Sequence, residues 1–101
     1  MQFITPLELK NKLNQTEDLF LLDIREAYER EVSSIPSHHI PMGEVCSRLD
    51  ELPIDKSVVV ICNSGARAEA LTNLLESDFK RDKMIILQGG MTAMLEFNNS
   101  L

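Results

Sequence analysis

Apolar residues in this chain occur in short runs that alternate with segments of helical spacing. The runs at 19–22, 58–61 and 84–87 are apolar without alternation, as in strands that are covered on both faces of a parallel sheet. A shorter run at 2–4 predicts an edge strand. Strands that alternate with helices predict an α/β fold with a mainly parallel sheet.

The helices are predicted from capping signals and from apolar spacing. In the first one, Thr5 can cap the N-terminus, Pro6 suits the first helical position and Glu8 completes a capping box. Leu9 and Leu13 lie one helical turn apart and are expected to face the core. Further elements are a short strand over 38–42 and helices over 24–31, 43–52, 67–76 and after Gly90.

The stretch around Cys62 combines several features of a reactive site. The strand over 58–61 ends at Cys62, a polar loop follows, and helical spacing begins after Arg67. Unpaired N–H groups at a helix N-terminus favour negative charge, and Arg67 adds a positive charge, so both favour the reactive thiolate. Gly65 permits positive φ, which lets several amides converge on one anion. We therefore interpret Cys62 as a nucleophile in an anion-binding loop and not as an ordinary core cysteine.

Other polar residues also follow predicted strands. Asp23 and the segment 88–90 lie at strand ends, as Cys62 does, and α/β proteins form their sites at this edge of the sheet. The paired glycines at 89 and 90 either approach the Cys62 loop closely or form a plain turn. A buried Asp23–Arg25 or Arg25–Glu29 ion pair would be a structural clamp more often than a catalytic one.

The sequence does not predict a metal site. His38 and His39 are adjacent in a predicted strand, so their side chains point to opposite faces and chelate poorly together. No cluster of Cys, His, Asp and Glu at ligand spacing accompanies them. We interpret both histidines as surface or hydrogen-bonded structural residues.

Length, charge and cysteine content narrow the class of protein. The chain has 101 residues, which suits one domain over 1–101, and its net charge of −6 argues against nucleic acid or an anionic membrane as a partner. Two cysteines, Cys62 and a half-buried Cys46, suggest a reducing compartment. No apolar run could span a bilayer, and the start does not have the layout of a signal peptide, so we expect a cytoplasmic location.

Three segments share their order and spacing with a known family. Asp23-Ile24-Arg25-Glu26, with Glu29, matches an Asp-x-Arg-Glu-x-x-Glu segment. Residues 62–67 match a Cys-x-x-Gly-x-Arg loop, and residues 89–90 match the start of a Gly-Gly-x-x-x-Trp segment. Together they resemble the rhodanese family of single-domain sulfurtransferases, and the similarity runs from about Thr5 to Phe97.

The chain departs from the family pattern at several positions. Asn63 stands where a basic residue is frequent, Ala68 where Ser or Thr is frequent, and Met94 where Trp is usual. Cys62 and Arg67 are retained. The lack of a basic side chain at position 63 weakens the expected preference for anionic thiosulfate.

The resemblance implies a single rhodanese-like domain with about five mostly parallel strands and helices on both faces. It also implies that Cys62 takes a sulfane sulfur from thiosulfate or a protein persulfide and passes it to cyanide or a thiol, without a metal or organic cofactor. Arg67 would anchor the loop or steer the donor. The implied substrate-binding residues are Asn63, Ser64, Gly65 and Ala66.

Three alternatives stay open at this point. Cysteine-dependent phosphatases and arsenate reductases on the same scaffold use Cys-x5-Arg, one residue longer than the Cys-x4-Arg of this loop. Rhodanese-like interaction modules usually lack the cysteine. A persulfide carrier that serves a partner enzyme would differ from the sulfurtransferase mainly in its donor.

Overall fold

The computed structural model describes residues 1–15 and 17–99 and contains one sheet of parallel strands. The strand order is β1-β5-β4-β2-β3, so β4 lies at the centre and β1 lies at an edge as predicted. Both the α/β class and the parallel sheet are therefore confirmed. The strands are β1 (Gln2–Ile4), β2 (Phe20–Asp23), β3 (His38–His39), β4 (Val58–Ile61) and β5 (Met84–Leu87).

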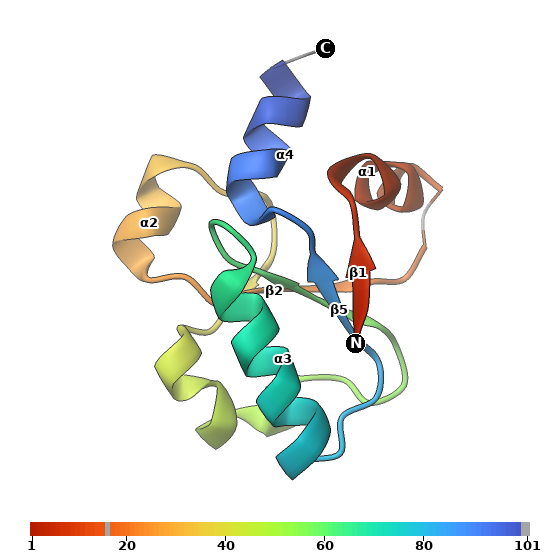
Figure 1. Ribbon diagram of the computed structural model, residues 1–101, viewed down its shortest axis with the longest axis vertical. Helices are drawn as coiled ribbons and strands as arrows, with labels where there is room; N and C mark the ends of the chain where they lie inside the picture. The colour runs from red at the N-terminus through yellow and green to blue at the C-terminus, as the bar shows by residue number, and fades with distance from the viewer. Residues whose placement is uncertain (16, 100–101) are drawn as a thin grey trace.

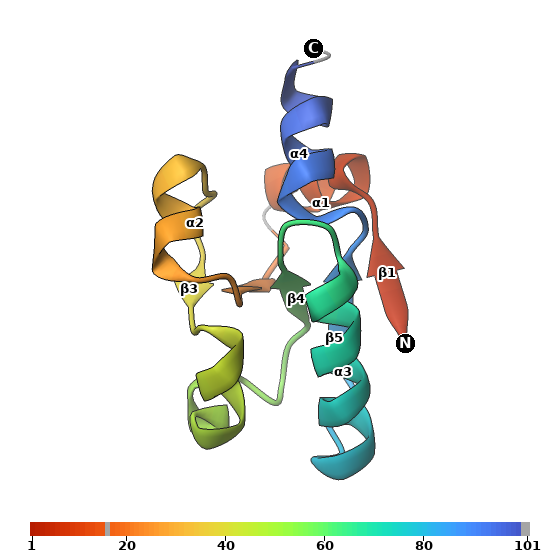
Figure 2. The ribbon, with the colours of Figure 1, turned by 60° about the vertical axis from the view of Figure 1, so that its left-hand side comes forward.

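Helices cover both faces of the sheet (Figure 1). Helices α1 and α4 lie together on one face, α3 and the short 3-10 helices cover the other, and α2 stands apart near β3 (Figure 2). Within the described ranges, no helix combines the length and the apolar character needed to cross a membrane. The bounds are α1 (Pro6–Asn14), α2 (Ala27–Val32), η1 (Met42–Ser47), η2 (Leu49–Glu51), α3 (Ala66–Asp78) and α4 (Gly90–Asn99).

Each central strand contributes to two cores because successive side chains point to opposite faces. Val58, Val60 and Cys62 pack with α3 and η1, whereas Val59 and Ile61 pack with α1 and α4. Burial on both faces explains why the run over 58–61 is apolar without alternation. It also places the Cys62 side chain on the α3 side of the sheet.

The structure confirms some helix predictions and corrects others. The Thr5–Glu8 capping box is present, and Leu9 is fully buried, but Leu13 is exposed. The segment 43–52 forms two 3-10 helices in place of one α-helix. Its backbone bonds span three residues, as in Arg48 N–H to the Val45 carbonyl, and the two helices are separated at Arg48, which leaves the helical region at φ −127°.

Two further boundaries are shorter than predicted. The helix expected over 24–31 begins only at Ala27, because the Arg25 N–H bonds the Asp23 carboxylate and Glu26 caps the helix. The strand expected over 38–42 is limited to His38–His39.

Candidate active site around Cys62

Cys62 sits at the carboxyl end of β4, and the start of α3 surrounds its sulfur. The residue has no exposed surface. The Gly65 N–H donates to Sγ at 3.0 Å and the Ala68 N–H at 3.4 Å. Gly65 caps α3 at φ +99°, a conformation that favours glycine, and so turns its amide toward the sulfur. This arrangement stabilises negative charge on the sulfur or on an atom attached to it.

The backbone of α4 holds the other side of the loop. The Met91 N–H donates to the Cys62 carbonyl at 2.8 Å, and the Thr92 N–H donates to the Asn63 carbonyl at 2.9 Å. A side chain at Gly90, which has φ +60°, would collide with both of these carbonyl groups. Of the two interpretations of the paired glycines, the close approach to the Cys62 loop is therefore confirmed.

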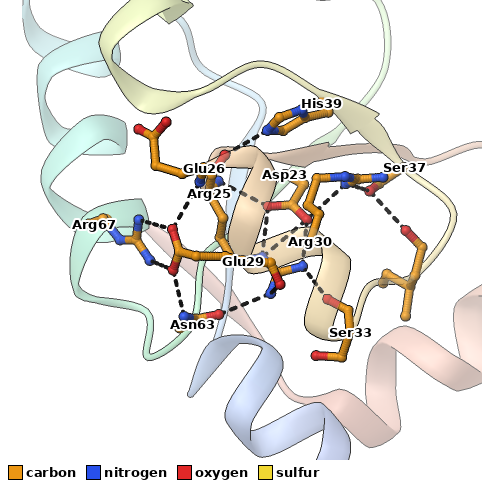
Figure 3. A network of polar contacts seen from close by, with 11 residues as sticks. Asp23, Arg25, Glu26, Glu29, Arg30, Ser33, Ser37, His39, Asn63 and Arg67 are labelled. Atoms are coloured by element: carbon orange, nitrogen blue, oxygen red, sulfur yellow. Dashed lines mark hydrogen bonds and ion pairs between the residues drawn. The ribbon is translucent and has the colours of Figure 1, made fainter.

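Arg67, Glu29 and Asn63 form a polar group, here called the outer cluster, that joins the loop to α2 (Figure 3). Arg67 donates to the two carboxylate oxygens of Glu29 at 2.9 and 2.6 Å, and Asn63 Nδ2 donates to Glu29 Oε2 at 2.6 Å. The hydrogen bonds from Arg67 lower the pKa of Glu29 to about 2, and the same contact raises the pKa of Arg67. Glu29 is therefore ionised at neutral pH and neutralises the positive charge of Arg67.

Asp23, Arg25 and Arg30 form a second group, here called the inner cluster. Asp23 and Arg25 are each only 1% exposed, and Arg25 Nη2 contacts Asp23 Oδ2 at 2.9 Å. Arg30 Nη1 contacts the same oxygen at 2.9 Å. The expected Asp23–Arg25 pair is thus confirmed. Arg25 also donates to Asn63 Oδ1 at 3.0 Å, so Asn63 links the two clusters.

The remaining predicted site residues contribute backbone atoms and small side chains to the Cys62 loop. Ser64 and Ala66 are exposed at the rim of the loop, and their side chains reach no other element in the described contacts. Asn63 was predicted to bind substrate, and its side-chain amide is bonded within the protein. Glu29 was assigned only to a structural clamp. The sequence analysis did not connect Glu29 with the Cys62 loop, because its partner Arg67 lies 38 residues away and nothing near Glu29 in the sequence points to it.

The other titratable candidates lie away from the loop or already have partners. Cys46 is exposed and not half-buried as predicted, because the 3-10 turn directs it outward. His38 contacts Glu51, and His39 contacts the Arg25 carbonyl oxygen at 2.6 Å. Over the described ranges, no group of His, Cys, Asp and Glu is arranged to hold a metal ion.

Comparisons with known proteins find similar sequences and similar folds. The family model described as "Rhodanese-like domain" matches residues 5–96. A sulfurtransferase of Allochromatium vinosum is 37% identical over 87 residues, which cover 84% of this chain and 79% of that protein. A rhodanese-like domain protein of Staphylococcus aureus has a similar structure, with a TM-score of 0.85, 28% identity and coverage of 93% and 91% of the two chains.

A further solved structure shares a higher identity over part of a longer protein. This is an NAD-dependent persulfide reductase from A. fulgidus, which is 36% identical with a TM-score of 0.70. The match covers 90% of this chain and 15% of the reductase chain.

Proposed function

This chain belongs to the family of rhodanese-like domains, and we propose that it is a sulfurtransferase that moves a sulfane sulfur through a persulfide on Cys62. The observation that supports this most directly is the pair of amides, from Gly65 and Ala68, that donate to Cys62 Sγ. Amides aimed at the sulfur favour the thiolate as nucleophile and the persulfide anion as intermediate.

The reaction has two displacements. In the first, the Cys62 thiolate attacks the outer sulfur of a donor, for example thiosulfate, so that the sulfur–sulfur bond of the donor breaks and sulfite leaves with the electron pair. Cys62 then carries the sulfur as a persulfide anion. In the second, cyanide or a thiolate attacks the outer sulfur, which gives thiocyanate or a new persulfide and restores the Cys62 thiolate. Neither step requires a metal or an organic cofactor.

The loop residues have separate roles in this proposal. Arg67 is a positioning residue, because its bonds to Glu29 fix the loop against α2. Asn63, Ser64, Gly65 and Ala66 surround the transferred sulfur. The donor is a small sulfur-containing anion or a protein persulfide, and the acceptor is a thiol. A carrier that receives its sulfur from a partner enzyme uses the same Cys62 chemistry and differs only in its donor.

Mass spectrometry of the intact protein tests the persulfide. After incubation with thiosulfate or with a low-molecular-weight persulfide, we expect the wild type and Cys46→Ser to gain one sulfur atom on Cys62. Cys62→Ser should gain none, and Cys46→Ser is the matched control because it removes the other thiol. If Cys62 gains no sulfur from any donor, the proposed function is wrong.

The same preparations should be assayed for hydrolysis of an aryl phosphate. A phosphoryl group has three equatorial oxygens that a loop must surround, and the Cys-x4-Arg loop is one residue shorter than in the phosphatases. We therefore expect no phosphate release. Phosphate release that depends on Cys62, without any persulfide, would favour the phosphatase alternative.

A further inference from the structure

We infer that Glu29 determines the donor specificity of the Cys62 site: by neutralising Arg67, it disfavours small, multiply charged anions such as thiosulfate and favours organic persulfides. This inference rests on the proposed sulfur transfer and specifies its donor class. It assigns to Glu29 a role beyond that of a structural ion pair.

Glu29 occupies the groups that an incoming anion would use. Both terminal nitrogens of Arg67 and the amide nitrogen of Asn63 point at its carboxylate, as Figure 3 shows, at 2.6 to 2.9 Å. These contacts form an anion clamp that is filled by a side chain of the protein itself. Because the pKa of Glu29 is lowered to about 2, the carboxylate stays charged at any pH at which sulfur transfer would be measured.

The other cations near the loop are paired as well. Arg25 and Arg30 both contact the Asp23 carboxylate. The hollow on the opposite side of the loop, bordered by Ser64 and Ala66, is lined by the acid Glu69 and, among the described residues, by no basic one. A net charge of −6 adds a general repulsion of anions. A dianion would thus meet, among residues 1–15 and 17–99, no unpaired cation at this site.

The two classes of donor differ at the atom next to the transferred sulfur. In thiosulfate this atom carries three oxygens, so a bulky and charged group must enter together with the sulfur. In an organic persulfide the corresponding atom is a sulfur that carries a single alkyl chain. The persulfide group is therefore narrower than the sulfite group of thiosulfate and carries at most one negative charge. A buried Cys62, beside arginines that are all paired in the part of the chain that the structure describes, therefore suits the persulfide. The transfer is R–S–SH plus Cys62–S⁻ to R–S⁻ plus Cys62–S–SH.

A groove next to the loop offers room for the organic part of such a donor. It lies between α2 and α4, borders Asn63 and has a volume of about 320 Å³. Tyr28, Val32 and Leu95, which are 69%, 86% and 39% exposed, line it beside the paired charges of Arg25 and Glu29. Apolar side chains at this position give a carbon chain a surface to contact, which a small inorganic anion cannot use.

The experiment compares thiosulfate with the persulfide of N-acetylcysteine methyl ester, whose organic part is uncharged. The variant is Glu29→Gln, which keeps the size of the side chain and removes its charge. Glu31→Gln is the matched control, because it removes one negative charge from the same helix at an exposed position. For each protein, kcat/KM is measured with both donors and a common acceptor, and thermal unfolding checks the fold.

We expect Glu29→Gln to raise the ratio of kcat/KM for thiosulfate to that for the organic persulfide on the order of tenfold, mainly through KM for thiosulfate. Glu31→Gln should leave the ratio unchanged. The ratio is informative because a loosened loop would lower activity with both donors alike. An unchanged ratio in Glu29→Gln overturns the inference, while the proposed function stands if Cys62 still accepts sulfur.

A wild-type measurement covers the case in which Glu29→Gln fails to fold. Sulfate has the charge and the tetrahedral shape of thiosulfate and is only slightly smaller, but it cannot donate sulfur, so it reports on anion binding alone. We expect sulfate to inhibit persulfide turnover of the wild type no more than chloride does at equal ionic strength. Strong, competitive inhibition by sulfate would show a free anion site and would overturn the inference.

Discussion

The inner and outer clusters lie side by side at the carboxyl end of the sheet, yet they differ in burial and in what they hold. In the inner cluster, Asp23 and Arg25 are each 1% exposed, whereas the Glu29 and Arg67 side chains of the outer cluster are 12% and 37% exposed. The inner cluster ties the end of β2 to α2 through the contact between Asp23 and Arg30. The outer cluster ties α2 to the Cys62 loop.

Because the two clusters differ in burial, we expect them to contribute differently to the stability of the fold and to sulfur transfer. A buried charge that loses its partner keeps the full cost of desolvation, whereas a partly exposed ion pair is screened by water and contributes little. The outer cluster instead fixes the position of a loop whose amides must point at one sulfur atom. We therefore expect the inner cluster to matter mainly for folding and the outer cluster mainly for sulfur transfer.

The largest effect is expected when the inner cluster is broken. Arg25→Ala leaves Asp23 with Arg30 as its one charged partner among the described contacts, beside the backbone N–H of residue 25, and also removes the bonds to Asn63 and to the Ser33 carbonyl. The free energy of unfolding should fall by about 3–5 kcal/mol, as measured by urea titration. Activity per folded molecule should fall less. Arg48→Ala, which breaks exposed ion pairs, is the control and should have little effect. A stable Arg25→Ala protein without turnover would show that the inner cluster serves sulfur transfer and not mainly folding.

Breaking the outer cluster should affect activity more than stability. Arg67→Ala removes both bonds to Glu29 and frees the loop, so kcat/KM with one persulfide donor should fall on the order of a hundredfold. Arg67→Lys keeps the charge but cannot donate to both oxygens in the same way, so an intermediate value is expected. The urea midpoint should change only slightly for both variants. Full activity in Arg67→Ala would show that the loop needs no anchor.

The smallest effect is the contribution of Glu29 to acid stability. Its pKa is about 2 in the folded protein, against 4.5 for an ordinary glutamate. A carboxyl group with a lowered pKa stabilises the fold fully above its unfolded pKa, and this contribution is lost as the pH falls from 4.5 toward 2. Glu29→Gln should therefore show a shallower loss of stability than the wild type between neutral pH and about pH 3.

A second glutamate provides the comparison for this acid effect. The pKa of Glu51 is also lowered to about 2, by Arg48 and then by His38, so the wild type loses this contribution together with that of Glu29 in the same pH range. Glu51→Gln should remove one of them and leave that of Glu29. The pH profiles of the two variants and the double variant are measured by urea unfolding. Equal profiles for the wild type and Glu29→Gln would contradict the expectation.

The sequence alone determined the elements whose signals are local. The apolar run over 58–61 specified a buried strand, and Thr5 with Glu8 specified the start of a helix, because burial on both faces and capping involve residues close in the chain. The Cys62 loop was found in the same way. Its glycine, its cysteine and the helix that follows are neighbours, and together they direct the Gly65 amide to the sulfur.

Only the tertiary structure decided which distant groups meet this loop. Glu29 reaches Arg67 across 38 residues, and Gly90 touches the Cys62 carbonyl because α4 packs against the end of β4. The partners of a charged side chain depend on where the packing of the sheet and helices places it, and no spacing in the sequence records that choice. The exposure of Cys46 was missed for a different reason, because the apolar spacing predicted one α-helix where two 3-10 helices form. Local chemistry thus located the nucleophile, and the packing of α2 and α4 around β4 built its surroundings.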